Sequence, residues 1–138
     1  MNPSFVLDCS VTMAWCFEDE ASRYTDAVLD SLKHTKALVP ILWQIEVANV
    51  LLMAEKKGRI QEASVFHFTH LLHQLPIEKD SNATLMADLI SFGRLHQLTS
   101  YDSCYLHLAL SFGLPIATLD EKLRNAAQKA GASFYLAG

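Results

Sequence analysis

The chain has 138 residues, the size of one globular domain and too short for two ordinary ones, so we expect a single domain over residues 1–138. Hydrophobic residues make up 51% of the chain and charged residues 19%, so it can bury a core and is not a disordered tail. The net charge of −4 argues against a histone-like nucleic-acid binder. It does not argue against a nuclease, because bound metal cations can invert the sign of an acidic site.

The N-terminal region and the apolar segments give no sign of export or membrane insertion. No Lys or Arg precedes Arg23, so a basic region before an apolar stretch is missing and we expect no signal peptide. The most apolar stretch, residues 41–54, is interrupted by Gln44, Glu46 and Asn49 and is too short to span a bilayer. The three cysteines form no C-x-x-C pair, which argues against a disulfide framework or a zinc knuckle. These features predict a cytoplasmic protein.

Short apolar strands alternate with helices along the chain. The predicted elements are a strand over residues 4–7, a helix over 23–34, a strand over 37–39, a helix from Pro40 to about Lys57 with Gly58 as its stop, a helix over 61–75, a strand near Ile77, a helix over 82–96, a helix from Ser100 to about Gly113, a strand over 116–119, a helix to about Ala130 and a strand over 133–136. This alternation predicts an α/β fold, a three-layer sandwich with a short, mostly parallel sheet flanked by helices.

Four acidic residues fall where such a fold places its ligands. Right-handed β–α–β connections bring the carboxyl ends of strands and the N-termini of helices to one edge of the sheet. Asp8 ends the first predicted strand, and Asp120 ends the strand over residues 116–119. Glu46 lies in the second turn of the helix that begins at Pro40, and Asp102 lies in the first turn of the helix that begins at Ser100. We therefore expect four carboxylates to converge at this edge.

Each aspartate also has a structural interpretation. Asp8 and Asp120 could cap the helices that follow them, and Asp102 fits a capping box with Thr99. Glu46 is harder to explain in this way, because it lies in an apolar segment with no Lys or Arg within one helical turn. An unpaired ionised carboxylate there would cost several kcal/mol, so it needs a partner, and a metal ion is one candidate.

Clustered carboxylates without matching cations favour a hard divalent cation. Mg²⁺ prefers oxygen ligands, binds through one or two carboxylates and keeps several waters, and Mn²⁺ accepts similar ligands. Such a site supports phosphodiester hydrolysis, because the metal polarises a phosphoryl oxygen and lowers the pKa of a bound water. The acidic residues therefore predict metal-dependent hydrolysis of a phosphodiester.

The segments around these acids resemble the PIN-domain ribonucleases, and specifically the toxin (VapC-like) half of type II toxin–antitoxin pairs. The matching stretches are VLDCSV, PILWQIEVANVL, LTSYDSCYLHLA and ATLDEKLRNAA, so the resemblance extends over essentially the whole chain. It implies that the acidic metal-binding quartet is Asp8, Glu46, Asp102 and Asp120, with Ser10 and Thr118 as hydroxyls beside the site. Asn49, one turn from Glu46, either hydrogen-bonds ligand or substrate or makes only a local contact.

The resemblance also carries expectations about activity and partners. It implies an endoribonuclease that uses Mg²⁺ or Mn²⁺ to cleave RNA, leaving a 5′-phosphate and a 3′-hydroxyl. It further implies inhibition by a cognate antitoxin protein and assembly as a homodimer. The alternative is a catalytically inactive PIN-like module that only binds protein or RNA. A dehalogenase-like phosphatase is a poorer match, because that chemistry needs a second Asp where Ser10 stands.

Overall fold

The fold is built around a four-stranded sheet in which every pair of neighbouring strands is parallel. The structure is a computed structural model that describes residues 2–82 and 84–137. Its strands are β1 (Phe5–Leu7), β2 (Ala37–Pro40), β3 (Ile77–Asp80) and β4 (Ile116–Ala117), in the order β3-β2-β1-β4. The central strand β1 is completely buried, as expected for a parallel sheet covered on both faces. The predicted α/β fold with a short parallel sheet is confirmed.

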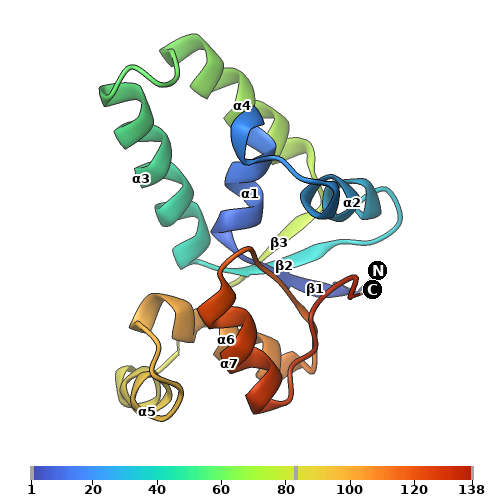
Figure 1. Ribbon diagram of the computed structural model, residues 1–138, viewed down its shortest axis with the longest axis vertical. Helices are drawn as coiled ribbons and strands as arrows, with labels where there is room; N and C mark the ends of the chain where they lie inside the picture. The colour runs from blue at the N-terminus through green and yellow to red at the C-terminus, as the bar shows by residue number, and fades with distance from the viewer. Residues whose placement is uncertain (1, 83, 138) are drawn as a thin grey trace.

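Helices cover both faces of the sheet, and seven α-helices lie in the described part of the chain. They are α1 (Cys9–Cys16), α2 (Arg23–Ser31), α3 (Leu42–Lys56), α4 (Glu62–Gln74), α5 (Met86–His96), α6 (Ser100–Phe112) and α7 (Glu121–Ala130), with a short 3₁₀ helix over Glu18–Glu20. In Figure 1, α1 to α4 lie on one side of the sheet and α5 to α7 on the other. Within residues 2–82 and 84–137, no helix is both long and apolar enough to cross a bilayer.

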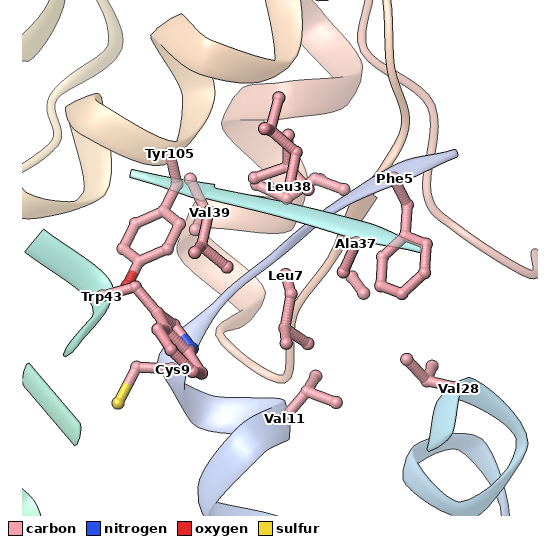
Figure 2. Close-up of a cluster of buried hydrophobic side chains, with 14 of the residues drawn as sticks. Phe5, Leu7, Cys9, Val11, Val28, Ala37, Leu38, Val39, Trp43 and Tyr105 are labelled. Carbon is pink, nitrogen blue, oxygen red and sulfur yellow. The ribbon is translucent and has the colours of Figure 1, made fainter. Parts of the chain in front are cut away.

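The core lies on both sides of the two central strands. In Figure 2, Leu7 of β1 points toward α1 and α2, near Val11, whereas Leu38 of β2 points to the opposite side. The ring of Tyr105, from α6, lies in the same cluster close to Trp43 of α3. Because Tyr105 has no exposed surface, its hydroxyl must find a partner inside the protein. That partner belongs to the site described below.

Two predicted helix starts differ from the structure. Pro40 is the last residue of β2 rather than the first of a helix, and α3 begins at Leu42. At the end of a strand, the missing N–H of proline costs at most one ladder hydrogen bond. The helix predicted from residue 82 begins at Met86, because the polar run before it favours turns over helix. Residue 83 of that prediction lies outside the described residues.

Two predicted strands are shorter than expected. The strand over residues 116–119 stops at Ala117, so Asp120 lies three residues beyond the sheet as the N-cap of α7. The strand predicted over residues 133–136 is only a single parallel bridge between Ile116 and Phe134. The chain turns at Leu136, which has a φ of +57°, so pairing with β4 cannot continue. The short edge strand β4 and the turn at Leu136 together limit pairing at this end of the sheet.

Candidate active site

Asp8 is the most deeply buried of the predicted acids. It follows β1 directly and is 6% exposed. Its Oδ2 accepts hydrogen bonds from the hydroxyls of Ser10 and Thr118, each at 2.7 Å. In the described structure its side chain makes no cap hydrogen bond to α1, so the capping interpretation is wrong for this residue. Burial raises the pKa of the carboxyl, and the two hydroxyl donors partly offset that effect.

The two hydroxyls tie Asp8 to the loop between β4 and α7. Ser10 Oγ accepts a hydrogen bond from the Leu119 amide at 2.9 Å, and Thr118 Oγ1 accepts one from the Asp120 amide at 3.0 Å. Each hydroxyl therefore donates to the Asp8 carboxylate and accepts from the loop backbone. This arrangement fixes Asp8 relative to Asp120, although more than a hundred residues separate them in the chain.

Glu46 has a partner that the sequence interpretation did not find. It lies in the second turn of α3, and its Oε1 accepts a hydrogen bond from the Tyr105 hydroxyl of α6 at 2.5 Å. Burial and the Asp8 carboxylate raise the pKa of Glu46, and the Tyr105 hydroxyl lowers it. The donor is not a Lys or Arg of the same helix but a phenol 59 positions away. One signal was available: Tyr105 lies three residues after Asp102, on the same face of its helix.

Asp102 lies in the first turn of α6, and Thr99 Oγ1 accepts a hydrogen bond from its amide at 3.1 Å. Its own carboxyl has a pKa raised to about 6. Burial is the largest cause, followed by repulsion from the carboxylates of Asp120, Asp8 and Glu46. The Thr99 side chain lowers this pKa, but by less than burial and repulsion raise it. The four predicted acids are therefore close enough to act on one another electrostatically.

Asp120 combines a structural role with a place in this acidic cluster. Its Oδ1 accepts hydrogen bonds from the amides of Lys122 and Leu123, at 2.9 and 3.2 Å, so the capping interpretation is confirmed for this residue. The same carboxylate raises the pKa of both Asp8 and Asp102. Asp120 therefore caps α7 and also repels the carboxylates of Asp8 and Asp102, so the N-terminus of α7 lies beside the acidic residues.

Asn49 stands apart from these contacts. It is exposed on α3, and no hydrogen bond within the described residues connects its side chain to the four acids. The structure thus joins Ser10 and Thr118 to Asp8 and leaves Asn49 outside this network.

The acidic cluster can be tested as a metal site from its donors. All of its side-chain donors are oxygens, which suits a hard cation such as Mg²⁺ or Mn²⁺. Over residues 2–82 and 84–137, no group of three or more His, Cys, Asp or Glu side chains is arranged so that it could hold a metal ion. Mg²⁺ commonly takes only one or two carboxylates directly and keeps its waters. The donor set therefore fits such an ion held by few direct ligands.

Comparison with protein families decides what kind of domain carries this site. The family model of the PIN domain matches residues 5–129, which includes all four acids. The chain belongs to the PIN-domain family. PIN domains are generally metal-dependent nucleases that use divalent ions, and PIN nucleases bind RNA. Membership in this family suggests a nuclease-type function for the PIN domain described here.

A solved structure supports the same fold. The chain is similar to the protein in the "Crystal structure of PAE2754 from Pyrobaculum aerophilum", with a TM-score of 0.72 and 24% sequence identity. The similarity covers 96% of this chain and 83% of that chain. At this identity the comparison supports the PIN fold alone. No curated protein matches the chain.

Proposed function

We propose that this PIN domain is a metal-dependent endoribonuclease that hydrolyses RNA phosphodiester bonds. The observation that carries the proposal is the set of four mutually repelling carboxylates at one edge of the sheet, Asp8, Glu46, Asp102 and Asp120. Across the described residues, none of the four forms an ion pair with Lys, Arg or His. Carboxylates that repel one another without a bound cation destabilise the fold. Their presence together therefore fits a site that binds a divalent ion.

Each acid has a proposed role in this reaction. Asp8 and Asp102 are the proposed direct ligands, and Glu46 and Asp120 complete the shell or hold metal-bound water. When bound, Mg²⁺ or Mn²⁺ supplies a polarised phosphoryl oxygen and a water of lowered pKa. Ser10 and Thr118 orient Asp8 by occupying its Oδ2, which leaves Oδ1 available to a ligand. Tyr105 holds Glu46 in position. The expected products carry a 5′-phosphate and a 3′-hydroxyl.

We further propose that the protein is the toxin of a toxin–antitoxin pair and forms a homodimer. Support comes from the resemblance of its four acidic segments to VapC-like toxins and from exposed apolar side chains. Ile45 and Leu52 on α3 are 59% and 64% exposed, and Phe66 on α4 is also exposed. Apolar surface of this kind is typical of a protein-binding face. Light scattering during gel filtration tests the dimer, and growth arrest on expression tests the toxin.

Cleavage of total cellular RNA by the purified protein tests the nuclease directly. The reactions contain Mg²⁺, Mn²⁺ or EDTA, and the Asp8→Asn variant serves as the matched control because it removes one charge while keeping the side-chain shape. We expect discrete fragments with either metal, and none with EDTA or with the variant. Full activity of folded Asp8→Asn protein would contradict the proposed mechanism.

The alternative is a PIN-like module that binds RNA or protein without cleaving it. One observation favours it: within the described residues, no group of three or more His, Cys, Asp or Glu side chains is arranged so that it could hold a metal ion. Isothermal titration of the protein with Mg²⁺ or Mn²⁺ separates the two functions. Metal binding that is lost in Asp8→Asn supports the nuclease. RNA binding without metal binding or cleavage supports the inactive module.

A further inference from the structure

A groove of about 610 Å³ opens beside the acidic cluster, between α2, the β4–α7 loop and the C-terminal segment. We call it the arginine groove; its main lining residues are Arg23, Tyr24, Thr118, Leu119, Arg124 and Phe134. The volume is within the range of small-ligand sites and is large enough for one nucleotide. The groove combines cationic, aromatic and apolar side chains in a protein whose net charge is −4.

The two arginines of the groove are free to bind an anion. Both are exposed, and in the described part of the chain neither takes part in an ion pair. Arg59 provides a contrast, because Asp19 and Glu20 hold its guanidinium at 2.8–3.1 Å. Glu121 also lines the groove, but among the ion pairs of the described residues there is none between Glu121 and Arg124. The groove therefore presents two uncompensated guanidiniums beside an acidic site.

Aromatic packing holds Arg124 in place before any ligand binds. Its guanidinium carbon lies 3.9 Å from the centroid of the Phe134 ring, and Phe134 is stacked on Tyr24 with centroids 4.8 Å apart. The Tyr24 hydroxyl donates to the Tyr135 carbonyl at 3.0 Å, which anchors this stack. A guanidinium that is already positioned loses less entropy when it binds a phosphate.

The arginine groove is continuous with the acidic cluster. Thr118 lines the groove and also donates to the Asp8 carboxylate. Arg124 follows Asp120 by one helical turn, and its amide donates to the Asp120 carbonyl at 2.9 Å. Four residues of helix advance about 6 Å along the axis. The cationic groove therefore begins about one turn of α7 from the carboxylates.

We propose that the arginine groove binds the RNA nucleotide next to the scissile bond, with Arg124 and Arg23 on its phosphate and the exposed side chains of Leu119 and Leu136 against its base or ribose. The inference rests on the proposed ribonuclease function and names a substrate-positioning subsite for it. RNA is the occupant we infer because Thr118 joins the groove to Asp8, so a strand placed at Asp8 can continue directly into the groove. The carboxylates repel its neighbouring phosphates, and these two guanidiniums can neutralise one of them.

Binding of a short fluorescein-labelled single-stranded RNA of mixed sequence, followed by anisotropy, tests this subsite. All variants carry Asp8→Asn so that the RNA stays intact. We expect Arg124→Gln and Arg23→Gln each to weaken binding about three- to tenfold. Each should also reduce the slope of log K against log salt concentration by about 0.7, the value for one lost phosphate contact on a single strand. Because Arg124 also packs on Phe134, Arg23→Gln provides a variant without that packing change.

Lys57→Gln is the matched control, since it makes the same charge change at the exposed C-terminal end of α3. It should alter neither the affinity nor the salt slope. If wild-type protein cleaves RNA but both arginine variants keep the affinity and slope of the Asp8→Asn parent, the subsite is overturned and the nuclease stands. If wild-type protein neither binds nor cleaves RNA, both proposals fail together. If Lys57→Gln lost as much RNA affinity and salt slope as the arginine variants, the effect would come from net charge alone, and the subsite would also be overturned.

Discussion

Burial and three neighbouring carboxylates disfavour the negative charge of Asp102, so removing that charge should stabilise the fold. Asp102→Asn replaces the carboxylate with a neutral amide of the same shape and keeps the backbone hydrogen bond to Thr99 Oγ1. The variant should be more stable than the wild type at neutral pH in the absence of metal. Stabilisation by loss of a functional group is expected where a site stores electrostatic repulsion for a ligand.

The magnitude follows from the raised pKa. The pKa of the Asp102 carboxyl rises from 3.8 to about 6, and 1.36 kcal/mol per pKa unit gives an upper bound of about 3 kcal/mol. The side chain is only half-buried, so solvent screening reduces the expected gain to about 1–2 kcal/mol. Because the folded state holds the proton more tightly, wild-type stability falls as pH rises from about 4 to 6 and stays lower above that range.

Urea unfolding at low ionic strength, at pH 4 and pH 8 with EDTA, measures this effect. Urea is preferable to guanidinium chloride because the salt would screen the repulsion. The matched control is Asp88→Asn, which makes the same change in the first turn of α5. That variant loses a favourable helix-dipole interaction, so its stability should fall slightly, with the opposite sign to Asp102→Asn.

Two results would refute the reasoning. One is a variant that is no more stable than the wild type at pH 8. The other is a gain that persists unchanged at pH 4, where the carboxyl is protonated in the folded state and most of the repulsion is therefore lost. Either result would mean that the four acids do not repel one another as their arrangement implies.

The hydrogen bonds that hold the acids give two further predictions. Tyr105→Phe removes the donor to Glu46 and should lower the free energy of unfolding at pH 7 by about 1–2 kcal/mol; a urea midpoint equal to that of the wild type would contradict a stabilising bond. Thr118→Val keeps the side-chain shape but removes the donor to Asp8 and the acceptor for the Asp120 amide. It should cost about 1–3 kcal/mol by the same assay, and a loss no larger than that of Thr69→Val on α4 would argue against the network.

Local patterns in the sequence predicted most of the elements and the places of the acids within them. The helical positions of Glu46 and Asp102 follow from spacing along single helices. The cap at Asp120 follows from bonds to amides two and three residues away. Such features depend on neighbours within one turn, which the sequence displays directly.

The tertiary structure alone decided the distant partners of Asp8 and Glu46. Asp8 could have capped α1, but the fold turns its carboxylate toward Thr118, 110 positions away. Glu46 is paired with Tyr105 only because α3 and α6 meet at the end of the sheet. The arginine groove likewise brings together Arg23 and Arg124, which lie far apart in the sequence. Contacts between distant residues depend on how helices pack over the sheet, and no short stretch of sequence encodes that packing.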